Sequence, residues 1–264
     1  MIARSTGLRT IFKPFNRRNL FRNLPKRSPF VAFTVLNSRH TLRETHFNDK
    51  PHRRMATFSN TDTGDKPSGP YYEKNVDNDV TLKEKVETLV KFVSSCKFGM
   101  MTTHDVVSGK LVSRCMAIAG KEGGDIDLTF TTNTESHKTD ELKADKHTNI
   151  SFCDSSGQWA SFAGNVSIET DRNVVKKFYS PTLKAWLGDL GDGVHDGSAD
   201  DPRIGVLRVK TSSVTYAITD KTLVGRMAEV AKGTITGEAA QVNKLREISE
   251  GEVRQWRATA AKVT

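Results

Sequence analysis

Hydrophobic and polar positions change their spacing at Thr81. In the segment TLKEKVETLVKFV the apolar residues recur every three or four positions, as on one face of a helix. Thr81 and Glu84 stand three residues apart, as in a capping box at a helix start. The pattern predicts a helix over residues 82–95.

Beyond this helix, short runs with apolar alternation are separated by turn sequences. They predict strands at residues 97–103, 111–120, 125–132, 149–154 and 159–169, and one or two final strands within residues 203–218. Helical spacing appears between them, at residues 135–145, 171–179 and 181–187. The Gly- and Asp-rich segment 188–201 is predicted to be a loop. Short strands joined by hairpin turns favour an antiparallel sheet or barrel over a parallel, doubly wound sheet.

The alternating strand 159–169 has two unlike faces. One face is apolar and is assigned to the core: Ala160, Phe162, Gly164, Val166 and Ile168. The other is small and polar except for one large ring: Trp159, Ser161, Ala163, Asn165 and Ser167. A face of this second kind suits contact with another subunit or a ligand edge, so we expect a two-fold dimer with Trp159 at the interface.

Both ends of the chain differ from this middle part. Residues 55–80 are rich in Gly, Pro, Ser, Thr, Asn and Asp and read as a flexible linker. Residues 221–264 are expected to be helical and mostly polar. One apolar face is predicted at Leu223, Val224, Met227, Val230 and Ala231, and a weaker one at Leu245, Ile248 and Val253. The central domain is therefore expected to span residues 81–220.

Positive charge is concentrated at the N-terminus. The chain of 264 residues has a formal net charge of +9, but residues 1–54 hold 13 Lys and Arg against 2 Asp and Glu. Such a segment, with no acid before Glu44, is typical of a mitochondrial transit peptide. It could instead be untranslated, with Met55 as the start, or act as a basic arm that binds RNA. The expected location is the mitochondrial matrix, or the cytoplasm if the segment is not translated.

The spacing of cysteines, histidines and apolar residues argues against disulfides, a metal site and a membrane span. Cys96, Cys115 and Cys153 lie far apart, so disulfides are not expected, and the last two, inside apolar runs, are predicted to be core residues. The histidines show no ligand spacing, so no metal site is expected. No apolar run reaches the roughly 18 residues of a membrane span, so no membrane partner is expected.

Candidate chemistry lies in FTTNTESHKTDEL, residues 130–142. A strand ends, a turn follows and a helix opens near Ser136, with Lys138 in a first turn that already carries positive potential. Free N–H groups, a hydroxyl and a lysine at one place suit a phosphate. Alternatively, Ser136 only caps the helix and Lys138 is solvated.

Arg114 interrupts the apolar strand LVSRCMAIAG. Alternation places Val112, Arg114 and Met116 on one face of that strand. If this strand neighbours residues 125–132, Arg114 reaches the helix start beside Lys138. Two cations and several hydroxyls would then surround one dianion.

The order SR-x-M, F-T-T-N, S-H-K and W-x-S-F-x-G resembles the pyridoxamine-phosphate-oxidase-like FMN-binding split barrels. The likeness covers about residues 82–220 and is nearest to the general stress proteins and fungal blue-light-inducible proteins of that superfamily. It implies a mainly β fold with helices, in the form of a six-stranded antiparallel split barrel that assembles into homodimers.

The resemblance also implies a binding site for FMN. Arg114 and Lys138 would hold its phosphate, with Ser136 and His137 beside them. The backbone of Cys115, Met116 and Ala117 would line the flavin ring. Thr131 and Thr132 would contact ribityl or ring atoms, and Trp159 or Ser161 would approach the flavin from a second subunit.

The chain also departs from the true oxidases. The lysine that follows the strand arginine by five residues in those enzymes is Ala119 here, and His137 stands where arginine is common. Trp256 and Arg257 match the substrate-binding end of the oxidases poorly. Trp186 is predicted to pack on its neighbours, or else to stack on the flavin.

The resemblance therefore favours an FMN-dependent oxidoreductase of unknown substrate, linked to stress or light, that is not a true pyridoxamine 5′-phosphate oxidase. One alternative is a non-catalytic flavin binder, carrier or sensor. Another is a mitochondrial nucleic-acid binder that uses the basic arm, which the near-neutral remainder of the chain argues against.

Overall fold

The computed structural model describes residues 67–77 and 79–262. The predicted targeting segment 1–54 lies outside these residues, as does the first part of the predicted linker. The helices are α1 (Pro70–Asn75), α2 (Leu82–Ser95), α3 (His137–Ala144), α4 (Arg172–Phe178), α5 (Leu183–Leu187), α6 (Leu223–Thr236) and α7 (Glu250–Ala260). The strands are β1 (Phe98–Asp105), β2 (Lys110–Glu122), β3 (Asp127–Asn133), β4 (His147–Cys153), β5 (Trp159–Glu169), β6 (Ile204–Ile218) and β7 (Lys244–Ile248).

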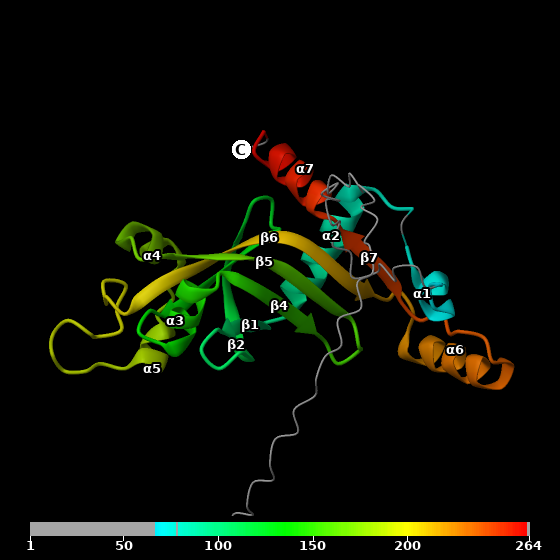
Figure 1. The fold of residues 1–264 in the computed structure, drawn as a ribbon, viewed down its shortest axis with the longest axis horizontal. Coiled ribbons are helices and arrows are strands. Elements are labelled where there is room, and N and C mark those ends of the chain that lie inside the picture. The colour runs from blue at the N-terminus through cyan, green and yellow to red at the C-terminus, as the bar shows by residue number, and fades with distance from the viewer. Residues whose placement is uncertain (1–66, 78, 263–264) are drawn as a thin grey trace, which may run out of the picture. The chain divides into compact units, whose positions relative to one another are not determined.

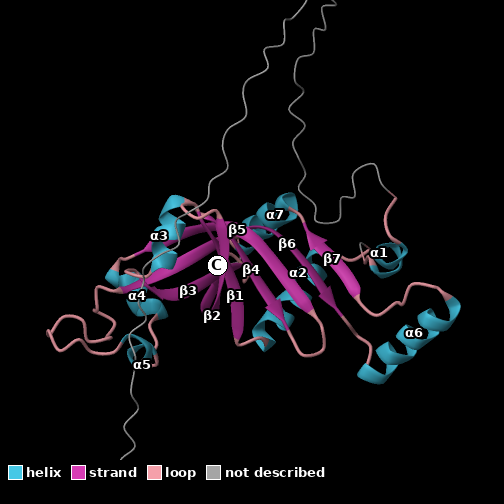
Figure 2. Cartoon of the chain, turned by 60° about the horizontal axis from the view of Figure 1, so that its bottom comes forward, coloured by secondary structure: helices cyan, strands magenta, loops and turns pink. Residues whose placement is uncertain are grey.

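The strands form one antiparallel sheet in the order β3-β2-β1-β4-β5-β6-β7. A further antiparallel pairing joins β3 to β6, from Leu128 opposite Val209 to Asn133 opposite Ile204. That pairing closes the first six strands into a barrel, and Figures 1 and 2 show the helices around it. The six-stranded antiparallel barrel with flanking helices predicted from the sequence is confirmed.

The barrel interior is filled by one face of each strand. In β5 the side chains of Ala160, Phe162 and Val166 are buried, while the alternate positions are partly or fully exposed, as the alternation predicted. Helix α2, found at its predicted bounds, contributes a row of buried side chains to the same core: Val86, Leu89, Phe92 and Val93. The Thr81 hydroxyl accepts the Glu84 N–H at the start of this helix.

A second, smaller core lies on the outer side of the barrel. Val175 of α4 is fully buried against Ile204 and Val206 of β6. Because these two side chains alternate with the core residues Leu207 and Val209, α4 covers the outer face of the strand. The first half of β6 is thereby buried on both sides.

The C-terminal segment contains a strand that the sequence did not predict. Residues 244–248 form β7, which pairs with β6 with Arg246 opposite Tyr216. The charged run KLREI concealed it, because Arg246 is buried and is paired with Asp77 and Glu84. The second helical face predicted there is therefore wrong for Leu245 and Ile248, which belong to the strand.

The predicted linker and the predicted burial of two cysteines also differ from the structure. The end of the predicted linker folds as α1, and Val76 after it bridges to Leu245. Cys115 and Cys153 are exposed, so their assignment to the core is wrong. Cys115 lies on an outer face of the sheet, where its neighbour Met100 on β1 is also 41% exposed.

Helix α7 holds the turn between β2 and β3. Its Trp256 donates from Nε1 to the Gly124 carbonyl at 2.8 Å, and Arg257 pairs with Asp127. These two residues therefore serve the fold. Within the described part of the chain, no helix has the length and apolar character needed to cross a bilayer.

The contact between α1 and the C-terminal segment generates a stability prediction. Asn75 is buried; its side chain donates to two carbonyls and accepts the N–H groups of Val242 and Asn243. Asn75→Ala leaves these backbone groups unpaired, so we expect the free energy of unfolding to fall by about 1–3 kcal/mol. Chemical denaturation measures this change. Asn173→Ala, at an exposed position, is the control, and equal effects of the two variants would contradict the role of Asn75.

Candidate functional site

Arg114 lies against helix α3 and is held by a carboxylate. It sits on β2 opposite Met101 of β1. Its Nη1 lies 2.7 Å from Glu141 Oε2, and its Nη2 lies 2.8 Å from Glu141 Oε1. Nη1 also donates to the Thr103 hydroxyl at 2.9 Å. The two-pronged contact with Glu141 fixes the plane of the guanidinium.

Glu141 was not predicted as a site residue. Its side chain is 1% exposed, and it also accepts a hydrogen bond from the Thr103 hydroxyl. The hydrogen bonds from Arg114, more than any other influence, hold the pKa of this carboxyl below its ordinary value. The sequence did carry a signal: Lys138, Glu141 and Leu142 share one face of α3, and a glutamate on a buried face needs a cation.

Lys138 is a buried cation whose partners are hydroxyl groups. It is 7% exposed, and its Nζ donates to the Thr132 hydroxyl at 2.5 Å and to the Ser136 hydroxyl at 3.3 Å. Within the described residues it forms no ion pair. Burial, reinforced by the charge of Arg114, lowers the pKa of the ammonium to about 8, and the Glu141 carboxylate opposes this shift less strongly.

The turn before α3 places the hydroxyl groups. The Asn133 side chain accepts the Glu135 N–H at 2.8 Å, and the Asn133 carbonyl accepts the hydroxyls of Ser136 and Thr139. The Ser136 side chain makes no capping bond to the helix and instead meets Lys138. The alternative in which Ser136 merely caps and Lys138 is solvated is therefore wrong.

Five of these residues form one polar group, which we call the Lys138 cluster: Arg114, Thr132, Ser136, Lys138 and Glu141. It carries two cations against one carboxylate, with two hydroxyls and the start of a helix beside the ammonium. N–H groups at the start of a helix have no acceptor in a preceding turn and favour an anion, although the Thr139 N–H of this helix already donates to the Ser136 carbonyl. The cluster therefore has the donors and the excess positive charge to bind a phosphate.

Two further predicted residues lie outside the cluster. His137 is largely exposed, and its Nε2 lies 3.6 Å from Glu141 Oε1, so it borders the cluster without being enclosed in it. Thr131 follows a buried Phe130 in β3, and alternation turns its side chain to the face opposite that of Thr132. The structure therefore brings Thr132 to Lys138 and does not bring Thr131 there.

The strand that carries Arg114 leads from the cluster to an outer face of the sheet. Cys115 and Ala117 are exposed there, and Met116 between them is partly buried. We call this face the open sheet face. It includes a row of directly opposite residues across β2, β1, β4 and β5, each exposed or partly exposed: Cys115, Met100, Ser151 and Ser161.

Trp159 and Ser161 do not reach the Lys138 cluster within one chain. Ser161 lies three strands from Cys115, and neighbouring strands are about 4.8 Å apart, so their backbones are separated by roughly 14 Å along the sheet. Trp159 pairs with Cys153, at the opposite end of β4 from helix α3. One subunit alone therefore does not bring the two parts of the predicted site into contact.

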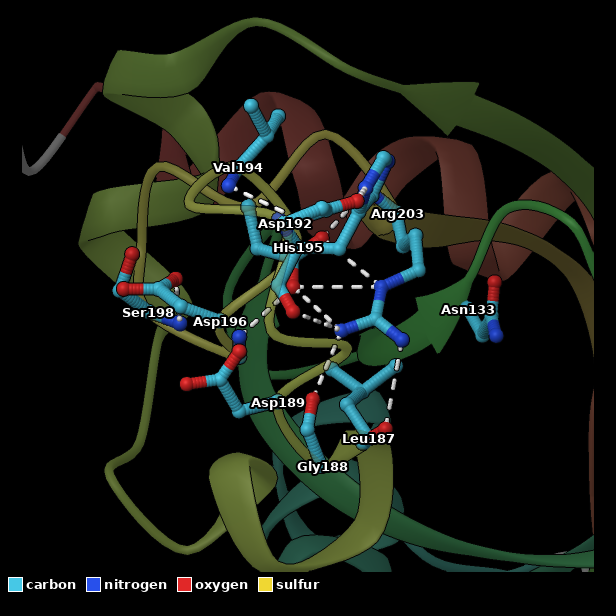
Figure 3. Close-up of polar contacts among 12 residues, drawn as sticks. Asn133, Leu187, Gly188, Asp189, Asp192, Val194, His195, Asp196, Ser198 and Arg203 are labelled. Carbon is cyan, nitrogen blue, oxygen red and sulfur yellow. Dashed lines mark hydrogen bonds and ion pairs between the residues drawn. The ribbon is translucent and has the colours of Figure 1, made fainter.

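A buried ion pair fixes the loop beside the cluster. Asp201 and Arg203 are both buried and paired at 2.7 Å. The Arg203 guanidinium also donates to the carbonyls of Leu187, Gly188 and His195 (Figure 3). The Arg203 carbonyl accepts the N–H of residue 134, in the turn that precedes α3. The loop 188–201 is thus tied to the same turn that places the cluster's hydroxyls.

Side chains on this loop and on α5 remain open to solvent. Trp186 is 86% exposed, so the prediction that it packs on its neighbours is wrong. Hydrogen bonds from the backbone and side chain of His195 hold the pKa of Asp192 far below its ordinary value, and the Asp192 carboxylate raises the pKa of His195. Among residues 67–77 and 79–262, no three His, Cys, Asp or Glu side chains are arranged to hold a metal ion.

The buried ammonium generates a prediction about pH. In the folded chain Lys138 loses its proton near pH 8, whereas in the unfolded chain it keeps it until about pH 10.4. Between these values the unfolded state binds more protons, so stability rises with pH. We expect urea unfolding of the ligand-free protein to show a gain in stability from pH 8 to pH 10 that Lys138→Met removes. If the stability of the parent and of the Lys138→Met protein changed with pH in the same way, Lys138 could not be a buried ammonium without an ion pair.

Comparison with known proteins identifies the family. Residues 84–241 match the family described as pyridoxamine 5′-phosphate oxidase like. The chain is 59% identical over 203 residues to Protein bli-3 of Neurospora crassa, covering 76% of this chain and 97% of that protein.

The chain also matches solved structures at lower sequence identity. General stress protein 26 of Bacillus anthracis is 22% identical, with a TM-score of 0.42 over 52% of this chain and 94% of that one. A pyridoxamine 5′-phosphate oxidase-related, FMN-binding protein of Nostoc punctiforme is 10% identical, with a TM-score of 0.42 over 53% and 85%. On the family match and the identity to Protein bli-3, the chain belongs to the pyridoxamine 5′-phosphate oxidase-like family.

Proposed function

We propose that this protein binds FMN and acts as an FMN-dependent oxidoreductase. The observation that carries the proposal is the buried Lys138 ammonium, which has hydroxyl partners and, within the described residues, no carboxylate paired to it. A buried cation is costly unless an anion compensates it. Membership of the family supports the phosphate of FMN as that anion.

Each residue of the Lys138 cluster would have a distinct part in holding the phosphate. Lys138 supplies the charge, and the Thr132 and Ser136 hydroxyls next to it would contact phosphate oxygens. Glu141 orients Arg114 and neutralises part of its charge, so Arg114 acts as an oriented donor rather than as a free cation. His137 lies at the rim, with its Nε2 3.6 Å from Glu141 Oε1.

The bound FMN would supply the redox chemistry, because its ring accepts and donates hydride or single electrons. The chain would supply binding and orientation. The backbone of Cys115, Met116 and Ala117 would line the ring, since these residues follow Arg114 directly along β2 and border the open sheet face.

A homodimer would complete the site. The open sheet face also carries Phe98 and Leu111, which are 58% and 73% exposed, and an apolar surface of this kind is normally covered by a partner. Trp159 and Ser161 do not contact the Lys138 cluster of their own chain. A two-fold arrangement would let these residues of one subunit approach the flavin of the other.

A non-catalytic flavin binder is the second candidate. It is favoured by Ala119, which stands where the true oxidases of the family resemblance carry a lysine. Anaerobic addition of NADH or NADPH separates the two candidates. An oxidoreductase that uses these donors bleaches the flavin absorbance, whereas a carrier leaves the flavin oxidised.

We also propose that the activity serves a stress or light response, and that residues 1–54 direct the protein to the mitochondrial matrix. The mass of the mature N-terminus in the natural host tests the second, because removal of the segment would leave a chain that begins near residue 55.

The phosphate assignment is tested by comparing two flavins. Lys138→Met removes a charged donor, so we expect FMN affinity to fall by about 1.5–3 kcal/mol, which is roughly 10–150-fold. Riboflavin lacks the phosphate and should bind both proteins equally. Lys143→Met, on the exposed side of the same helix, is the matched control and should leave FMN affinity unchanged. Equal losses for FMN and riboflavin would show that Lys138 does not bind a phosphate.

The shared site is tested at Trp159. Trp159→Asp places a charge on the open sheet face, so we expect both weaker dimerisation and lower flavin content. Asn173→Asp adds the same charge at an exposed position on α4, away from the open sheet face, and is the control. Sedimentation and flavin absorbance are measured on the same samples. A Trp159→Asp protein that stays dimeric and fully loaded with flavin would refute the placement of this ring at a shared site.

A further inference from the structure

Helix α6 carries a wide apolar face that is open to solvent. Five large apolar side chains of the helix are more than half exposed: Leu223, Val224, Met227, Val230 and Ile235. None of the helix's residues is buried. A helix of this pattern normally buries its apolar stripe. The opposite face, with Gly225, Glu229 and Gly233, is the less exposed one and is turned toward the rest of the chain.

One side chain of α6 ties the helix to the barrel: Arg226 donates to the Ser156 carbonyl in the turn between β4 and β5. Two local contacts shape the ends of the helix. The Thr222 hydroxyl caps it by accepting the Gly225 N–H at 3.2 Å, and the chain after it turns back so closely that a side chain at Gly233 would collide with the carbonyl of residue 238. The apolar face lies on the side of the helix away from these contacts.

A second apolar patch, which we call the loop patch, lies on α5 and the loop after it. Its residues Trp186, Leu190 and Val194 are 86%, 63% and 56% exposed. The buried Arg203–Asp201 pair holds this segment through three backbone carbonyls (Figure 3). The loop patch is thus a fixed part of the fold, and it adjoins the turn that places the Lys138 cluster.

The two apolar surfaces lie apart within one chain. The loop patch precedes the start of β6, α6 follows its end, and β6 has 15 residues. At about 3.3 Å per residue this strand separates them by roughly 45 Å along its length. Figures 1 and 2 both show α5 and α6 at opposite ends of β6. In a two-fold dimer whose β6 strands run in opposite directions, the end of one strand lies near the start of the other.

The charges around the two surfaces are opposite in sign. Segment 188–201 contains five aspartates and no lysine or arginine. Asp201 is buried and paired with Arg203, and Asp200 is paired with Lys176, so Asp189, Asp192 and Asp196 supply the negative charge of this segment. On α6, Arg226 and Lys232 outnumber the single acid, Glu229, which is already paired with Lys221. Complementary charge at the rim of matching apolar surfaces steers and orients association. The loop patch is therefore a suitable partner surface for α6.

We propose that α6 of one subunit packs its apolar face on the loop patch of a second copy of this chain. The inference rests on the dimer of the proposed function and adds a specific contact to it. Each subunit then covers the loop beside the partner's Lys138 cluster. The C-terminal segment thereby becomes part of the surroundings of the site in the other subunit.

Cross-linking between two differently tagged chains tests the contact. In both copies the three natural cysteines are replaced by serine; one copy also has Met227→Cys and the other Leu190→Cys. Mixed dimers are treated with a short bis-maleimide. We expect a covalent heterodimer that requires both introduced cysteines. Thr236→Cys, on the opposite face of α6, replaces Met227→Cys in the matched control and should give little product.

Two results would overturn the contact. One is a product that forms from Met227→Cys alone, because α6 would then pack on its own copy in the partner. The other is the lack of a heterodimer product in samples that sedimentation shows to be dimeric and absorbance shows to contain flavin. In that second case the proposed function survives and this contact does not. A monomer without flavin would refute both.

A second pair of variants in the natural cysteine background guards against misfolding of the serine-substituted protein. Met227→Glu places a carboxylate in the proposed contact, next to an acidic loop. We expect the dimer dissociation constant to rise on the order of tenfold or more, because burying an unpaired charge is costly. Thr236→Glu carries the same charge on the other face and should leave the constant unchanged. Equal constants for the two variants would also reject the contact.

Discussion

The Lys138 ammonium is buried where the chain supplies hydroxyls but no paired carboxylate, and the site depends on that imbalance. The carboxylate of Glu141, which shares the inner face of α3, is already engaged by both terminal nitrogens of Arg114. The ammonium therefore keeps an uncompensated charge, and its pKa falls to about 8. An anion that enters beside it would gain a charge interaction in a place largely shielded from water, which is where such interactions are strongest.

Closure of the barrel places the residues that create this charge imbalance. The β3–β6 pairing brings Asn133 and the turn after it to the start of β6, where the Arg203 carbonyl receives an N–H of that turn. Helix α3 follows this turn and packs against β1. Lys138 and Glu141, one turn apart on its inner face, then reach hydroxyls of β3 and the guanidinium of β2. Neither the helix nor the strands would form the cluster alone.

Much of the fold could be predicted because periodicity and turns are local properties: helix 82–95 and the six barrel strands followed from spacing. The missed strand β7 depends on distant segments, because Arg246 can be buried only where Asp77 and Glu84 reach it. Within the site, the two cations stood out as charges that interrupt apolar or helix-start patterns. Glu141 looked like an ordinary helical glutamate, and only its place against the barrel shows that it engages one cation and leaves the other free. The apolar face of α6 was also predicted, but only the fold shows that it points away from the chain's own core.

The most direct measurement is the pKa of Lys138, followed by NMR of the labelled side-chain nitrogen with and without flavin. The account predicts a value near 8 in the ligand-free protein, and a rise of at least about one unit when FMN binds, because a phosphate favours the charged ammonium. Riboflavin should leave the value near 8. A ligand-free pKa as high as the roughly 10.4 of an ordinary lysine, or a pKa that FMN does not change, would contradict the claim that this ammonium is the phosphate's partner.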